Sequence, residues 1–124
     1  MINIPSGYQT VMPYLIVKNA AKFSAFTQKV FSAEEKMRHM RDEKIIMHAE
    51  VIIGGSTIMF ADATEQFTER TTGLFVYVEN ADETFKKALD EGATSLMLPA
   101  DQSYGRSSGV EDPFGNTWWI TTPL

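Results

Sequence analysis

The feature that most constrains the fold of this sequence is a strand-to-helix junction that occurs twice. Residues 14–20 read YLIVKNA and residues 75–81 read FVYVENA, so an apolar segment is followed by Asn and Ala in both places. Asn is a favourable N-cap residue, which predicts that a strand passes directly into a helix at each position. The sequence therefore predicts two copies of one structural unit, although the match weakens beyond the junction.

The segments that follow each junction have the same predicted order. Period-2 apolar patterns indicate strands, and one apolar stripe at helical spacing follows each Asn. The predicted strands are residues 10–17, 34–41, 44–53, 56–62, 73–78, 94–99, 103–111 and 116–121, and the predicted helices are residues 20–31 and 81–91. We therefore expect an α+β fold with one domain over residues 1–124, built from two βαβββ modules at about 10–62 and about 73–122.

Alternation along the strands predicts which side chains face the helices. The aliphatic Leu15 and Val17 suit packing under a helix, whereas Tyr14 lies on the other face of its strand. A tight turn at residues 54–55 pairs the flanking strands so that Glu50 and Met59 share one face. A similar turn at residues 42–43 predicts a shared face for the set Met37, His39, Arg41, Ile46, His48 and Glu50. The opposite face is predicted to carry Ile45, Met47, Ala49, Val51, Ile58 and Phe60.

Composition excludes several classes of partner. The chain has a net charge of −5, which argues against nucleic acid and anionic membranes as partners. It contains no cysteine, so disulfides, thiolate metal sites and cysteine nucleophiles are excluded. The first ten residues lack the basic and apolar regions of a signal peptide, and no window is apolar enough to span a membrane. We therefore expect a cytoplasmic protein.

Three motifs carry a resemblance to a known family. With this order of elements, the segments PYLIV, MHAEVIIGGSTIMFAD and DPFGNTWW resemble the vicinal oxygen chelate superfamily, and most closely its PhnB-like branch. That superfamily includes glyoxalase I, bleomycin-resistance proteins and extradiol dioxygenases. The resemblance implies a curved mixed sheet with helices on its convex face, a ligand cleft on its concave face, and a homodimer.

The resemblance also implies where a metal would bind. Metal-dependent members hold one divalent ion with His, Gln and Glu side chains, and the corresponding positions here fall on Met12, Met59, Gly73 and Trp119. None of these four residues offers a hard oxygen or imidazole donor. We therefore expect no metal at the usual position and no cofactor.

His48 and Glu50 are the candidate catalytic residues, and two interpretations of each stay open. Together with His39 they could form a 2-His-1-carboxylate metal site, which is a known ferrous geometry. Glu50 could instead be a general base whose pKa is raised by burial, or a structural partner of His48, Lys36 or Arg41.

Further ligand contacts are predicted in the second module. Arg106 lies in the glycine-containing segment 104–109 and could bind an anionic ligand, or could pair with Glu111 or Asp112. Adjacent residues on a strand point to opposite faces, and the family resemblance implies that Trp118 lies in the core and Trp119 in the cleft. The predicted ligand contacts are Tyr14, His48, Glu50, Met59, Tyr77, Tyr104, Arg106 and Trp119.

The function that these observations predict is binding of a small molecule in the concave cleft without the family's metal. The alternative is an isomerase, lyase or dioxygenase of the same fold that uses His48 and Glu50 as acid and base or as replacement metal ligands. A third alternative is a dimeric domain whose cleft is filled by side chains. The sequence does not name the ligand, since one fold hosts many chemistries.

Overall fold

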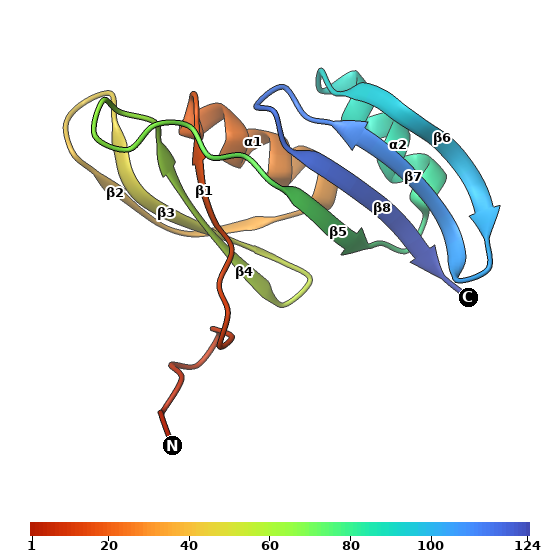
Figure 1. The fold of residues 1–124 in the computed structure, drawn as a ribbon, viewed down its shortest axis with the longest axis horizontal. Coiled ribbons are helices and arrows are strands. Elements are labelled where there is room, and N and C mark those ends of the chain that lie inside the picture. The colour runs from red at the N-terminus through yellow and green to blue at the C-terminus, as the bar shows by residue number, and fades with distance from the viewer. The chain divides into compact units, whose positions relative to one another are not determined.

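The computed structural model describes residues 1–124 and divides into two compact units, which are described one at a time. The first comprises residues 1–28 and 32–70, and the second comprises residues 29–31 and 71–124. The elements, labelled in Figure 1, are β1 (Tyr14–Val17), α1 (Ala20–Phe31), β2 (Glu34–Met40), β3 (Ile46–Ile53), β4 (Ser56–Asp62), β5 (Gly73–Tyr77), α2 (Ala81–Asp90), β6 (Thr94–Gln102), β7 (Gly105–Glu111) and β8 (Thr117–Pro123). The predicted α+β class and the repeated βαβββ order are confirmed.

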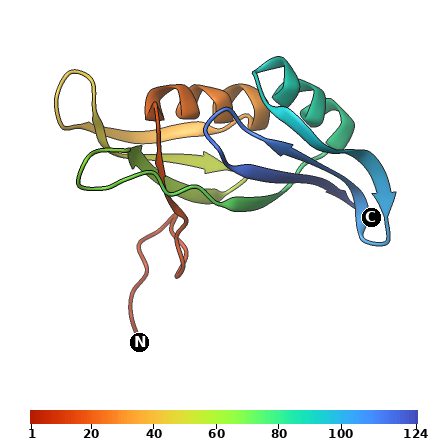
Figure 2. The same cartoon turned by 45° about the horizontal axis from the view of Figure 1, so that its top comes forward.

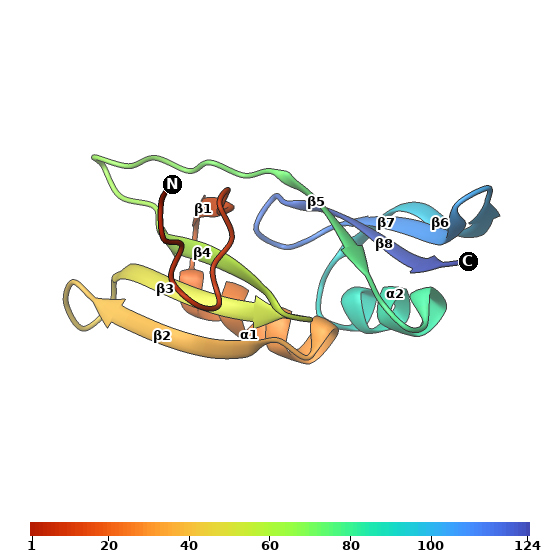
Figure 3. The same ribbon diagram turned by 90° about the horizontal axis from the view of Figure 1, so that it is seen from below.

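The sheet of the first unit has the strand order β1-β4-β3-β2. Strand β1 runs parallel to β4, and the other neighbours are antiparallel. Helix α1 covers one face, where the Phe23 ring lies 5.0 Å from the Phe60 ring and both side chains are buried. The N-terminal segment lies on the opposite face (Figure 2) and crosses β3 and β4 when it is seen from below (Figure 3). This sheet therefore has a helix face and an open face.

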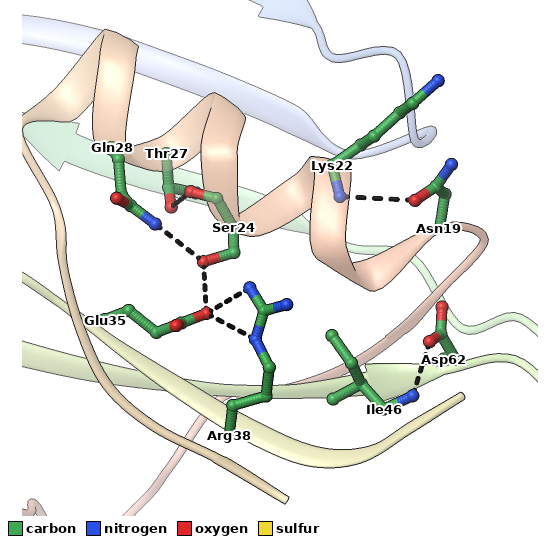
Figure 4. A network of polar contacts seen from close by, with 9 residues as sticks. All are labelled: Asn19, Lys22, Ser24, Thr27, Gln28, Glu35, Arg38, Ile46 and Asp62. Carbon is green, nitrogen blue, oxygen red and sulfur yellow. Dashed lines mark hydrogen bonds and ion pairs between the residues drawn. The ribbon is translucent and has the colours of Figure 1, made fainter. Parts of the chain in front are cut away.

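Polar contacts tie α1 and the strand ends together, as Figure 4 shows. The Asn19 side chain caps the helix by accepting a hydrogen bond of 3.3 Å from the Lys22 amide. Asp62, at the end of β4, accepts a bond of 2.7 Å from the Ile46 amide. Each of these contacts satisfies a backbone donor that would otherwise need water.

The sheet of the second unit has the equivalent order β5-β8-β7-β6, with β5 parallel to β8. Helix α2 packs on β6, β7 and β8. Trp118 is 1% exposed, its ring lies 4.5 Å from the Phe31 ring, and its indole N–H donates to Asp112 at 2.8 Å. The buried Asp112 also accepts bonds from the backbone N–H groups of Phe114 and Asn116, so it organises the DPFGN turn. The prediction that Trp118 is a core residue is confirmed.

A bulge near the start of β3 overturns part of the predicted faces. His39 pairs with His48, but the next residue, Met40, pairs with Ile46, so Met47 is an extra residue in its strand. The extra residue reverses the alternation, and Ile46 is therefore buried whereas Met47 is 57% exposed. The prediction that Ile46 shares the face of His48, with Met47 in the core, is wrong for this reason.

Candidate functional site

Four cross-strand neighbours form a row on the open face of the first sheet. The row runs across β1, β4, β3 and β2 through Tyr14, Met59, Glu50 and Met37. His48 lies two residues before Glu50 on β3 and therefore points to the same face. The predicted shared face of Tyr14, His48, Glu50 and Met59 is confirmed, and their role in ligand binding stays a prediction.

Hydrogen bonds connect these side chains into a series that we call the His48 chain, composed of Tyr14, His48, Glu50 and Tyr8. The Tyr14 hydroxyl lies 2.8 Å from His48 Nδ1, and His48 Nε2 lies 2.7 Å from Glu50 Oε2. The Tyr8 hydroxyl donates to the other carboxylate oxygen, Glu50 Oε1, at 2.6 Å. Each oxygen of Glu50 thus has a partner of its own.

Burial along the His48 chain is greatest at Glu50. Tyr14 is 47% exposed, whereas Glu50 is 2% exposed. Such a buried carboxylate is stable only with donors on its oxygens, and the bonds from Tyr8 and His48 supply them. The Lys36 ammonium lies 3.8 Å from the centre of the Tyr8 ring and adds positive charge on the same side.

The pKa values distinguish the roles of Glu50 and Tyr14. Burial by itself would raise the pKa of Glu50, but the hydrogen bonds from Tyr8 and His48 and the charges of His48 and Lys36 together hold it below its ordinary value. Burial and the nearby Glu50 charge raise the pKa of Tyr14. The predicted rise in the pKa of Glu50 is therefore wrong, the pairing of Glu50 with His48 is confirmed, and a role of Glu50 as a base stays a prediction.

These protonation states fix the direction of the hydrogen bonds. An ionised Glu50 accepts from His48 Nε2–H, so in a neutral imidazole Nδ1 is the acceptor for the Tyr14 hydroxyl. A carboxylate that orients an imidazole, which in turn contacts a hydroxyl, is the arrangement used in catalytic triads. The single Tyr14 hydroxyl proton is thus donated to Nδ1, so the His48 chain can present an oriented phenol oxygen as an acceptor, or an oriented imidazole base where Tyr14 moves aside.

The residues present do not fit the divalent ion that the family's metal-dependent members hold. Met59 and Trp119 lie on the open faces of their sheets and offer a thioether and an indole, while Gly73 offers no side chain. Hard divalent ions prefer oxygen and imidazole donors. His39 and His48 are cross-strand partners, but no group of three or more His, Cys, Asp or Glu side chains is placed to hold a metal.

The open face of the second sheet carries aromatic rings in place of a polar chain. Its central row runs through Phe75, Trp119, Gly109 and Met97. Trp119 is 38% exposed, and its ring lies so close to Gly109 that a Cβ at this position would overlap it. The ring of Phe75 lies 5.2 Å from that of Tyr77 and 6.4 Å from that of Tyr104. Exposed rings of this kind suit stacking against a planar partner.

Arg106 is not brought together with Tyr77 and Trp119. Its guanidinium donates to Asp82 at 2.6 Å and 3.1 Å and to Asp101 at 3.1 Å. Its cross-strand partner Thr122 accepts a bond from the first amide of α2, which places this position on the helix face of the sheet. The predicted pairing with Glu111 or Asp112 is wrong, because these neighbours in sequence lie at the other end of β7.

Tyr8 is the contact that sequence reasoning missed. It lies in a segment without regular secondary structure, and no local pattern links it to Glu50, which lies 42 residues away. The position of a side chain across such a distance depends on how the segment folds back. No sequence signal would have found it.

Comparisons with known proteins agree with this fold. A family model, the Glyoxalase/Bleomycin resistance protein/Dioxygenase superfamily, matches residues 8–120, and the chain belongs to this superfamily. An uncharacterized protein from Mycobacterium bovis is 32% identical over 90% of this chain and 82% of its own length.

Solved structures share the fold at lower identity. TnmS3, an antibiotic binding protein from Streptomyces sp. CB03234, superimposes with a TM-score of 0.74 at 15% identity over 100% of both chains. A PhnB protein from Bacillus cereus gives a TM-score of 0.70 at 19% identity, over 92% of this chain and 99% of its own. Neither helix of this chain has the length and apolar character needed to cross a membrane.

Proposed function

We propose that this protein binds a small organic molecule on the open face of the first sheet, at the His48 chain, without a divalent metal ion. The observation that carries the proposal is the half-exposed Tyr14 hydroxyl, held by His48 at 2.8 Å and supported by the buried Glu50. Met59 and Met37 lie on either side of Glu50 in the same row and provide an adaptable apolar surface. An oriented polar group beside apolar side chains suits a small-molecule site.

Two further observations support binding in preference to turnover. The structural neighbour TnmS3 is an antibiotic binding protein, and a binding function needs only apolar walls and a few polar anchors. The second unit separately exposes Tyr77, Tyr104 and Trp119, which we propose as ligand contacts of their own. Arg106 would contact an anionic ligand only after leaving Asp82 and Asp101.

Calorimetric titration with a panel of small-molecule antibiotics tests the proposal. Binding is expected to be the same with chelator and with added divalent ions, and to weaken at least tenfold in Tyr14→Phe and His48→Asn. His39→Asn is the matched control, because His39 is the cross-strand partner of His48. Binding that requires a stoichiometric metal, or that is unchanged in both variants, would overturn it.

The hydrogen-bond geometry of His48 favours a second candidate, an enzyme that moves a proton. Glu50 holds Nε2 at 2.7 Å, which leaves Nδ1 as the reactive nitrogen once Tyr14 is displaced. Deuterium exchange at carbon beside the carbonyl of ketone and aldehyde substrates, followed by NMR, tests this activity. Exchange is expected in the wild type and absent in His48→Asn; no exchange in the wild type would exclude this candidate.

The homodimer implied by the family resemblance stays a prediction. Light scattering on a sizing column is expected to give twice the chain mass of 13.9 kDa. A mass that stays at the monomer value across concentrations would contradict it.

A further inference from the structure

Tyr8 occupies a place on the open face of the first sheet that has the features of a binding site for a phenol. Its hydroxyl donates to the buried Glu50 at 2.6 Å, which is the length of a charge-assisted O–H···O⁻ bond. The Lys36 ammonium lies against the face of its ring at 3.8 Å from the centroid. A carboxylate thus recognises the hydroxyl and a cation recognises the ring.

The segment that carries Tyr8 is held to the sheet by polar contacts. None of residues 1–13 is buried. Thr57 Oγ1 donates to the Gly7 carbonyl at 2.6 Å, and the Gln9 side chain donates to the Thr57 carbonyl at 2.9 Å. A segment with no buried apolar anchor opens locally at low free-energy cost, so Tyr8 can leave while the sheet stays folded.

When Tyr8 leaves, the Glu50 carboxylate lacks a hydrogen-bond donor that only some ligands can replace. Glu50 Oε1 would lose its donor, and a ligand that covers this oxygen and keeps water away from it must supply another donor, because an unsatisfied charged oxygen in a buried position is costly. A ligand that fills this place without a hydroxyl would leave Glu50 Oε1 buried without a donor, and its binding would carry the full free-energy cost of that. A phenol would restore both the bond to Glu50 and the contact with Lys36.

We propose, on the basis of the proposed function, that the place of the Tyr8 side chain is the binding site for a phenolic ring of the ligand. Tyr8 is then an internal competitor that fills the site when no ligand is bound. The ligand class is a hydroxylated aromatic compound, in which the hydroxyl contacts Glu50 Oε1 and the ring face contacts Lys36.

Chemical complementation tests this proposal. Tyr8→Ala deletes the atoms of one phenol, so phenol itself is the probe, and anisole, whose hydroxyl is methylated, is the matched compound. NMR titration is expected to show that phenol binds Tyr8→Ala at least tenfold more tightly than the wild type and tenfold more tightly than anisole does. Tyr8→Phe keeps a competing ring but removes the hydroxyl that donates to Glu50, so it is expected to bind phenol more tightly than the wild type and less tightly than Tyr8→Ala.

Two lysine variants test the contact with the ring. Lys36→Met, introduced together with Tyr8→Ala, is expected to weaken phenol binding several-fold, whereas Lys22→Met on α1 is expected to leave it unchanged. Equal affinities for phenol and anisole, or for the wild type and Tyr8→Ala, would overturn the phenol site. These outcomes do not depend on the antibiotic panel, so failure of the phenol site and failure of the proposed function remain distinguishable.

Discussion

The two units share one scaffold but carry different chemistry on their open faces. Each has a parallel pair of strands at one edge, a central antiparallel strand and a bulged outer strand. Equivalent rows cross the two sheets: Tyr14, Met59, Glu50 and Met37 in the first, and Phe75, Trp119, Gly109 and Met97 in the second. The comparison shows which position in the row makes one open face polar and the other aromatic.

The decisive difference lies at the third position of the row. In the first unit Glu50 places a carboxylate there, and this group organises Tyr8 and His48. In the second unit Gly109 leaves the place free, and the ring of Trp119 covers it. The same backbone therefore supports a polar chain in one case and an aromatic surface in the other.

The helix junctions, by contrast, make equivalent side-chain contacts in both units, although the backbone of Asn19 is left-handed and that of Asn80 is extended. Asp62 at the end of β4 accepts a bond of 2.7 Å from the Ala20 amide, and Thr122 at the end of β8 accepts one of 2.8 Å from the Ala81 amide. Both contacts satisfy the amide at the start of a helix. The repeat thus conserves the means of attaching a helix while the open faces differ.

The largest effect is expected from removing the carboxylate of the first row. Glu50→Ala leaves Tyr8 and His48 without their acceptor, and we expect the free energy of unfolding to fall by about 3–6 kcal/mol, because each bond to a charged group contributes about 1.5–3 kcal/mol. Urea denaturation measures this loss. Glu43→Ala, in an exposed turn, is the control and should change stability by less than about 0.5 kcal/mol. Equal effects of the two substitutions would contradict the role given to Glu50.

A smaller effect is expected from filling the equivalent place in the second row. Gly109→Ala would force the Trp119 ring to move, at a cost of about 1–2 kcal/mol, together with a change in tryptophan fluorescence. Gly73→Ala is the matched control, because a Cβ there meets no atom within 4 Å. The cost of Gly109→Ala should shrink when Trp119→Ala is already present. If the free-energy changes of Gly109→Ala and Trp119→Ala are strictly additive, the position of the Trp119 ring does not depend on Gly109.

The smallest effect is expected in the pH dependence of stability. The pKa of Glu50 is lowered in the folded state, so its contribution is fully present above the ordinary pKa of 4.5 and is lost as the pH falls through the folded value. Urea denaturation between about pH 7 and pH 3 should therefore show that the advantage of the wild type over Glu50→Gln declines in acid. If the advantage of the wild type stays constant over this range, the lowered pKa of Glu50 is contradicted.

Much of the fold follows from local sequence patterns. Asn19 and Asn80 accept from the amides three residues later, as expected for N-caps. Alternation placed Leu15 in the core and Tyr14 outside, and it separated Trp118 from Trp119 in the same way. These features depend on a residue and its immediate neighbours, so the sequence is sufficient to predict them.

The features that could not be predicted depend on contacts between distant segments. The bulge at Met47 has no local signature, yet it moves Ile46 to the other face. Strand β1 begins at Tyr14 and not at residue 10, because Pro13 has no amide hydrogen to extend the ladder. Arg106 pairs with Asp82 on α2, which depends on how the helix packs. The candidate site was predicted only as far as the faces of β1, β3 and β4.

The strand orders also determine how each sheet meets other molecules at its outer edge. Strand β2 lies at one edge of the first sheet and carries Glu34, Lys36 and Arg38. The charges of these side chains oppose edge-to-edge pairing with strands of other molecules. Strand β6 ends the second sheet with Leu96 and Leu98 exposed by 53% and 70%. Only Pro99 interrupts its row of backbone donors. Aggregation in concentrated solution is thus expected to begin along the first part of β6, because residues 94–100 carry no charged side chain and only one proline.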